Sequence, residues 1–226
     1  TVSGHQYDLP DPFFVMATQN PIEQEGTYPL PIAALDRFLF KVHVDYPDSE
    51  EELNMLLATT SRGEQEVQPV VTKEQVVTML RTVREIHIAE DTMEYAVRLV
   101  RATRPTQSDD SYIKEMVETG GSPRAVQALI LGGKAHAALD GRDEAMPKDL
   151  RSIIHPALRH RVVPSFHANA DGINSDQLID YVVEHTARPR NDKTETVVEK
   201  RPFNLMRWLL GEPKPRKRAI SLQPNV

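Results

Sequence analysis

ATQNPIEQEGTYPLPIAALDRF, residues 17–38, joins two short apolar segments of the chain. The segment FFVMAT at 13–18 is a nearly continuous apolar run, which is typical of a strand buried on both faces of a parallel sheet. The segment RFLFKVHV at 37–44 alternates apolar with other residues, which favours a second strand. Since two strands do not form a stable sheet alone, we expect residues 1–47 to end a larger α/β domain.

After residue 47 the apolar residues recur at helical spacing and predict a series of packed helices. Pro156 is expected to kink or end its helix, and VVPSF at 162–166 resembles a short strand. We therefore expect a helical domain at 48–187. The apolar stripes that predict its helices are Leu53, Leu56 and Leu57; Val76, Leu80 and Val83; Met93, Ala96, Val97 and Val100; Val126, Leu129, Ile130 and Gly133; Leu150, Ile153, Ile154 and Ala157; and Leu178, Ile179, Val182 and Val183.

Composition indicates a globular protein. Of 226 residues, 39% are hydrophobic and 27% are charged, and no apolar run approaches the ~18 residues of a membrane span. The absence of cysteine excludes disulfides and fits a reducing compartment, so we expect a cytoplasmic protein. The sequence starts without methionine or a signal-peptide pattern, which leads us to expect a fragment of a longer protein.

Charge is distributed unevenly along the chain. Residues 188–226 hold ten basic and four acidic residues, whereas the whole chain carries a net charge of −6. The acidic remainder is not expected to attract nucleic acid, and we expect no specific nucleic-acid partner. Residues 188–226 are expected to form a flexible basic tail, whose KPRKR cluster at 214–218 could make a weak membrane contact.

Asn20 is the first candidate for phosphate recognition. It follows the strand expected at 13–18, and ligands of open parallel sheets bind beyond the carboxyl ends of the strands. An uncharged amide at this place can orient a water molecule or a terminal phosphate. The alternative is that Asn20 and Pro21 only start a turn.

Two arginines are further candidates. Ser122 and Pro123 are typical of a helix start, so Arg124 would add a cation to the positive end of a helix. A phosphate nearby would stabilise that arrangement, although a solvated side chain or a salt bridge would also explain it. Arg37 precedes the second expected strand and could reach a partner's phosphate, or it could pair with Asp36 or Asp45.

Two apparent motifs carry no chemistry. GGKAHA at 132–137 lacks the glycine and hydroxyl residue of a phosphate loop, because alanine stands at 128 and 135, and we expect a helix there. His155, His160 and His167 match the spacing of no metal motif, so we expect no metal site.

The order of several motifs is more specific than any one of them. ATQNP, IEQEGTYPLP and LDRF are followed by RLVRATR, GSPRA, an alanine-rich helix and LRHR. This order resembles the C-terminal portion of the MoxR family of AAA+ ATPases, over residues 3–187. The resemblance implies that Asn20 is the sensor 1 residue, that Arg37 is an arginine finger acting on a neighbouring subunit, and that Arg124 is the sensor 2 residue contacting the phosphates of ATP.

The implied fold is mainly α with a small α/β part. Residues 1–47 would be the C-terminal end of a P-loop AAA+ αβα core, and residues 48–187 an all-helical lid domain. The family implies ATP and Mg²⁺, ring homo-oligomers that are usually hexamers, and chaperone-like maturation of client proteins. It is often associated with proteins that contain von Willebrand factor A domains. The Walker A and Walker B elements are missing from the sequence, so the chain alone is not expected to hydrolyse ATP.

Two other classes stay open at the level of sequence. The same ATP cycle could drive a related motor, such as a subunit like magnesium chelatase or a replicative helicase. The chain could instead be an interaction module without ATPase activity. The unbroken match through IEQEGTYPLP favours the MoxR family.

Overall fold

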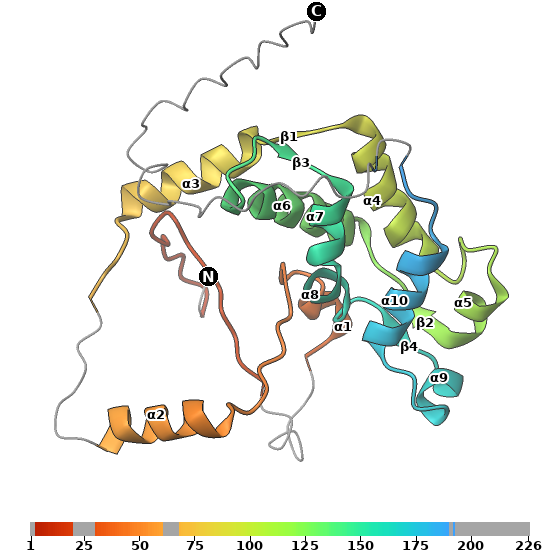
Figure 1. Ribbon diagram of the computed structural model, residues 1–226, viewed down its shortest axis with the longest axis horizontal. Coiled ribbons are helices and arrows are strands. Elements are labelled where there is room, and N and C mark those ends of the chain that lie inside the picture. The colour runs from red at the N-terminus through yellow and green to blue at the C-terminus, as the bar shows by residue number, and fades with distance from the viewer. Residues whose placement is uncertain (1–2, 20–29, 61–67, 190–191, 193–226) are drawn as a thin grey trace, which may run out of the picture.

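The computed structural model of the chain describes residues 3–19, 30–60, 68–189 and 192, and helices dominate them (Figure 1). The helices are α1 Ile32–Leu35, α2 Ser49–Thr60, α3 Lys73–Glu85, α4 Glu90–Ala102, α5 Ser111–Met116, α6 Pro123–Leu139, α7 Pro147–Ser152, α8 Ile154–Leu158, α9 Phe166–Ala170 and α10 Ser175–His185. The strands are β1 His87–Ile88, β2 Val117–Thr119, β3 Glu144–Ala145 and β4 Val163–Pro164.

Besides a small apolar cluster between β1, β3 and the end of α6, one large apolar core holds the described helical body together. α6 lies at its centre and contacts α3, α4, α7 and α8 (Figure 1). Leucines on α4, α6, α7, α8 and α10 are completely buried, and the mainly helical fold that the apolar stripes predicted is confirmed. Burying such side chains is the main source of stability for short helices in water. The fully buried leucines are Leu99, Leu129, Leu150, Leu158 and Leu178.

Two pairs of very short strands brace the helices. β1 pairs with β3 in parallel, and β2 pairs with β4 in antiparallel orientation. The β4 strand lies within the 162–166 segment that the sequence predicted to be extended. β2 leads directly into the loop that precedes α6.

The start of α6 follows directly from its sequence. Ser122 is the N-cap, and its Oγ accepts a hydrogen bond from the backbone N–H of Arg124 at 3.1 Å. Pro123 occupies the first helical position, where its missing N–H costs nothing. The helix continues through 132–137, which confirms that GGKAHA is a helical segment. At Gly132 an added Cβ would lie 2.7 Å from Cζ of Phe40, so this glycine admits the Phe40 ring against α6.

The helix expected around Leu150 and Ala157 is divided in two. α7 ends at Ser152 and α8 begins at Ile154, with Ile153 between them. Pro156 therefore falls in the first turn of α8, where a backbone N–H has no partner within a helix. A continuous helix would have placed the proline ring against the carbonyl four residues earlier. The expected kink is thus an interruption at Ile153.

The two strands expected at 13–18 and 37–44 are not formed. A strand is stable only beside a hydrogen-bonded neighbour, and the described residues place no neighbouring strand beside either segment. Phe13, Phe14 and Val15 are mostly exposed. The second segment packs on the helical body instead, where Phe40 contacts the core and the Lys41 N–H donates to the Pro156 carbonyl at 2.8 Å.

α2 also differs from expectation. Its helix forms where predicted, but Leu53, Leu56 and Leu57 remain at least half exposed, and in Figure 1 the helix lies apart from the helical body. The expectation that this stripe is covered by a neighbour is therefore wrong for the described part of the chain. None of the helices described is long and apolar enough to cross a membrane.

Candidate functional site

The carboxylate of Asp36 connects three parts of the chain that are far apart in sequence. It lies in the turn of residues 36–39 that follows α1, hereafter the 36–39 turn. Ser122 Oγ, at the start of α6, donates to this carboxylate, at 2.8 and 2.9 Å from its two oxygens. Arg124 Nη1 lies 3.4 Å from Oδ2, and Arg161 Nε lies 2.9 Å from Oδ1. The 36–39 turn is therefore fixed to both the start of α6 and the segment after α8.

Arg161 holds the backbone of the same turn. Its side chain is only 3% exposed. Nη2 donates to the carbonyls of Asp36 at 2.8 Å and Phe38 at 2.7 Å, and Nη1 donates to the carbonyl of Leu39 at 3.2 Å and to that of Ala157. The planar guanidinium has five donors in a fixed arrangement, which suits it to several acceptors at once.

His160, next to Arg161 in the sequence, also contacts the 36–39 turn. Its Nε2 lies 3.1 Å from the Phe38 carbonyl, and the ring is largely buried. Burial lowers the pKa of His160, and the neighbouring charge of Arg161 lowers it further. A neutral ring with the proton on Nε2 fits these surroundings, because the Phe38 carbonyl accepts a hydrogen bond there.

The electrostatics of the cluster favour an ionised Asp36. Burial alone would raise the pKa of Asp36, but the hydrogen bonds from Ser122 and Arg161 and the charge of Arg161 outweigh burial and lower it. Burial lowers the pKa of the Arg161 guanidinium, an effect that Asp36 opposes. The pair therefore consists of a carboxylate and a guanidinium that stabilise each other in a water-poor place.

The loop before α6 is attached to the end of α4. Thr103 Oγ1 accepts a hydrogen bond from the Gly121 N–H at 2.9 Å, and Arg104 Nε donates to the Gly121 carbonyl at 2.7 Å. At Gly120 an added Cβ would lie 2.3 Å from the Thr103 carbonyl oxygen, so the loop approaches α4 as closely as only glycine permits. The motifs RLVRATR, GSPRA, LRHR and LDRF thus meet in one place.

The structure places two of the three predicted site residues. Arg124 is at the start of α6, with a side chain 55% exposed, and the Asp36 carboxylate provides the anion that its position favours. Arg37 is exposed, and its Nη1 donates to the Ala33 carbonyl at 2.7 Å. The ion pairs of Arg37 with Asp36 or Asp45 are not recorded among the described residues. Asn20 lies outside the described residues.

Sequence reasoning missed the roles of Asp36, His160 and Arg161. The sequence indicates Asp36 only as a possible partner of its neighbour Arg37. Arg161 is noted only within LRHR, and His160 only there and among three histidines that match no metal motif. One signal was available. An arginine between the buried residues Leu158 and Val162 needs acceptors inside the protein, because a buried charge is rarely left without a partner. Nothing in the sequence indicates that those acceptors lie more than 120 residues upstream.

A second charged cluster lies between α6 and α7. Asp149 is fully buried and accepts hydrogen bonds from Arg142 Nη1 at 2.8 Å and from the Met146 N–H at 2.7 Å. His136 Nδ1 lies 2.8 Å from its Oδ1. Burial alone would raise the pKa of Asp149, but the Arg142 hydrogen bond and the Met146 N–H lower it. His136, Asp140 and Asp149 are close enough to hold a metal ion. The Arg142 guanidinium already bridges both carboxylates, so the cluster fits a structural ion pair.

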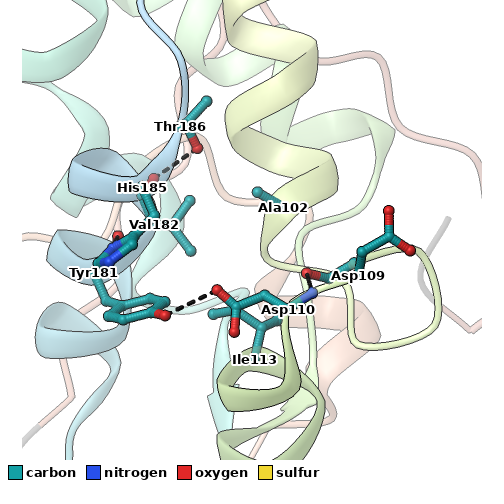
Figure 2. Close-up of a pocket in the computed structure, with 9 residues that line it drawn as sticks. Ala102, Asp109, Asp110, Ile113, Tyr181, Val182, His185 and Thr186 are labelled. Carbon is teal, nitrogen blue, oxygen red and sulfur yellow. Dashed lines mark hydrogen bonds between the residues drawn. The ribbon is translucent and has the colours of Figure 1, made fainter.

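The pocket shown in Figure 2 lies between α4, α5 and α10. Its volume is about 230 Å³, and Tyr181 Oη donates to Asp110 at 2.8 Å across it. That hydrogen bond lowers the pKa of Asp110 and raises the pKa of Tyr181. Thr186 Oγ1 donates to the Val182 carbonyl and the His185 ring stacks on Tyr181. Because these polar groups bind one another, they hold α10 against the start of α5. We therefore do not assign a catalytic role to this pocket.

Comparison with known proteins supports the family that the order of the motifs resembles. Residues 1–40 match the model of the ATPase family associated with various cellular activities, and residues 109–182 match the AAA lid domain. The chain is 41% identical over 180 residues to the uncharacterized protein YeaC of Bacillus subtilis, covering 79% of this chain and 54% of YeaC. It is 37% identical over 191 residues to Chaperone MoxR1 of Mycobacterium tuberculosis, covering 84% of this chain and 50% of MoxR1.

A solved structure gives the same result for the fold. The crystal structure of a candidate ATPase from Cytophaga hutchinsonii superposes with a TM-score of 0.76 at 34% identity, over 84% of this chain and 58% of that one. The chain spans about half the length of the curated relatives that it matches. Its lid match, its mainly helical fold and its MoxR relatives agree, and the chain belongs to the MoxR family of AAA+ ATPases.

Proposed function

We propose that this chain supplies the lid and the arginine-bearing segments of a chaperone-like ATPase that remodels or matures client proteins. The observation that carries the proposal is the Asp36 cluster, in which LDRF, GSPRA and LRHR are bound together. One side of this cluster presents Arg37 to solvent, and the other presents Arg124 at the positive end of α6. An exposed arginine can complete a nucleotide site on a neighbouring subunit, and an arginine at a helix start can contact phosphates; both cations suit the charge that develops when a phosphoryl group passes to water.

Residues 1–47 are proposed to be the end of the AAA+ core and residues 48–187 the lid. Matches to the ATPase family over 1–40 and to the lid domain over 109–182 support this division. The contact of the 36–39 turn with the lid would then be the joint between the two domains. Through this joint, movements of the lid would reach the core. The lack of cysteine favours a cytoplasmic location for the protein.

In the proposed reaction, Arg124 binds the phosphates of ATP and Arg37 stabilises the charge that develops at the nucleotide of a neighbouring subunit. The phosphoryl group of ATP would pass to water, and a bound Mg²⁺ would neutralise part of the charge on the phosphates. Asp36 does not suit a Mg²⁺ ligand, because its carboxylate is already bound by Ser122, Arg124 and Arg161. Asn20 is proposed as the sensor that orients the attacking water.

The proposal implies a ring of identical subunits, most simply a hexamer. An arginine finger completes a site on the adjacent subunit, so activity would depend on assembly. The solvent-exposed position of Arg37 supports this arrangement. Client proteins, including proteins with von Willebrand factor A domains, are the proposed targets of the motor.

Replacing Arg37 with alanine tests the proposal. The variant is made in the full-length protein, with any sequence that precedes Thr1 included. We expect steady-state ATP turnover by the assembled ring to fall by roughly 10³-fold or more, because the transition-state charge loses its partner. Equilibrium binding of a fluorescent ATP analogue should change little, since the finger is supplied by another subunit.

Arg84 on α3 provides the matched control for this variant. It is an exposed arginine outside the Asp36 cluster, so Arg84→Ala is expected to keep turnover near that of the wild type. Ring assembly is checked for each variant by analytical ultracentrifugation. Wild-type turnover in assembled Arg37→Ala rings would contradict the proposed finger.

A further inference from the structure

We propose that Arg161 is the positioning residue for Arg37, so that the lid sets the place of the arginine offered to the neighbouring subunit. This inference rests on the proposed function of Arg37. It assigns a role to a buried residue 124 positions away in sequence, and it makes the helical body responsible for the geometry of a site on another subunit.

The first argument is the cost of burying Arg161. A guanidinium that is 3% exposed has lost nearly all its contact with water, and such a charge is retained only where its donors are well satisfied. Of its hydrogen bonds, those to the Asp36 carboxylate and to the Asp36, Phe38 and Leu39 carbonyls all go to the 36–39 turn. The turn cannot move away from the lid without leaving this charge unpaired.

The second argument is the position of Arg37 within the turn. The carbonyls of Asp36 and Phe38, on either side of Arg37, both accept from the same Nη2 atom of Arg161, at 2.8 and 2.7 Å. His160 Nε2 holds the Phe38 carbonyl as well, at 3.1 Å. The backbone on both sides of Arg37 is thus fixed, while its own side chain is exposed and donates to the Ala33 carbonyl of α1, a contact that it would give up to reach a neighbouring subunit.

The third argument links Arg37 to Arg124. Asp36 binds Arg161 from one side and Ser122 and Arg124 from the other, so both site arginines share one anchor. Arg161 keeps Asp36 paired when Arg124 turns from that carboxylate toward a phosphate. Arg161 therefore keeps its partner in both states, whereas Arg124 can exchange Asp36 for a phosphate.

Arg161→Lys in the full-length protein tests the inference. Lysine keeps the charge but has one donor group in place of a planar fork, so it cannot bind the Asp36 carboxylate and the three carbonyls of the 36–39 turn together. We expect the kcat for ATP hydrolysis to fall by about 10- to 10²-fold, because small displacements of a catalytic group have effects of this size. The Kd for an ATP analogue should stay within about twofold, since Arg124 keeps its helix position.

Arg142→Lys is the matched control. Arg142 is another largely buried arginine of the lid, but it binds Asp149 and makes no recorded contact with the 36–39 turn. A defect caused by weakened lid packing would appear in both lysine variants, whereas a defect in positioning Arg37 would appear only at Arg161. Thermal unfolding and ring assembly are measured for both.

Mixed rings separate positioning from local damage. Arg161→Lys subunits are combined with subunits whose ATP-binding loop is inactivated but whose Arg37 and Arg161 are intact. A nucleotide site on an Arg161→Lys subunit then receives a correctly placed arginine from its neighbour, and turnover per active site is expected to rise toward that of the wild type. No rise would mean that the defect lies in the variant subunit's own site, and the inference would be wrong.

The outcomes also separate this inference from the proposed function. If Arg37→Ala abolishes turnover but assembled Arg161→Lys rings retain the wild-type kcat, the inference fails and the finger stands. If Arg37→Ala is fully active, the proposed function fails. Should Arg161→Lys prevent assembly, Asp36→Asn serves in its place, because it keeps the shape of the side chain and removes the charge that Arg161 faces. Wild-type kcat in assembled Asp36→Asn rings would overturn the inference.

Discussion

Asp36 and Arg161 form an ion pair whose partners lie 125 positions apart in the sequence. An exposed ion pair would contribute little to stability, but both of these side chains are largely shielded from water. Removing either partner would leave the other charge buried, which is far more destabilising than the loss of the contact alone. The pair therefore gives the 36–39 turn one defined position on the helical body.

His160 makes this position sensitive to pH. The residue is 6% exposed, Nε2 faces the Phe38 carbonyl, and Nδ1 is buried with no hydrogen-bond partner among the described residues. The pKa of His160 lies below its ordinary value of 6.5. As the pH falls below that value, the unfolded chain binds a proton that the folded protein resists. The free energy of unfolding is therefore expected to decrease as the pH falls from about 6.5 toward the pKa of the folded state.

His160→Gln tests this pH dependence. Glutamine keeps an N–H donor for the Phe38 carbonyl but does not titrate, so the decrease in the free energy of unfolding below about pH 6.5 should become smaller. Urea unfolding of the full-length protein at several pH values between about 5 and 7.5 measures the change. His167→Gln, at an exposed position of α9, is the control. Identical pH dependence in wild type and His160→Gln would contradict the expectation.

At the scale of elements, the loop between β2 and α6 decides where Arg124 stands. Gly120 lies against the backbone of Thr103 and Arg104, and a Cβ there would be 2.3 to 2.7 Å from backbone atoms that cannot rotate away. Gly120→Ala is expected to destabilise the protein by about 1–3 kcal/mol, as overpacking usually does. It should also displace Ser122 and weaken the binding of an ATP analogue.

Thermal unfolding and analogue binding check this expectation. Thr119→Ala is the control, because it changes an exposed side chain next to the same loop. A fully stable Gly120→Ala protein with unchanged analogue binding would show that the loop has more room than its geometry indicates.

Local sequence patterns predicted the helices better than the sheet. α4, α6 and α10 followed from apolar stripes, and Ser122 with Pro123 fixed the start of α6. In α4 the buried side is turned slightly from the predicted one, because Tyr95 and Leu99 are fully buried while Met93 and Val97 are partly exposed. The strands expected at 13–18 and 37–44 could not be judged locally, because a strand depends on neighbours from elsewhere in the chain.

The candidate site was predicted only in part, because some of its contacts also join residues that are far apart in the sequence. The place of Arg124 at a helix start follows from its neighbours in sequence, and the structure confirms that place. The anion that it faces is Asp36, 88 positions earlier, and no periodicity indicates such a contact. The resemblance to a family gave roles to Arg37 and Arg124, but the buried arginine that joins their surroundings became visible only in the folded chain.

At the scale of the whole molecule, the helical body holds a segment that the family match assigns to the ATPase core. The core match ends at residue 40, and residues 36–41 pack on helices of the lid through Asp36, Phe40 and Lys41. If residues 1–47 end the core and 48–187 form the lid, as we propose, movement of the lid would reach Arg37 through this turn. Assembly, nucleotide state and lid position would then be coupled in one ring.

A double-mutant cycle between Arg37 and Arg161 tests the central claim most directly. The kcat for ATP hydrolysis is measured for the full-length wild type, Arg37→Ala, Arg161→Lys and the double variant, all as assembled rings. If Arg161 acts through Arg37, Arg161→Lys lowers kcat in the wild type but causes no further loss once Arg37 is alanine. Equal fold-losses from Arg161→Lys in both backgrounds would show that the two arginines act independently, and would contradict the account.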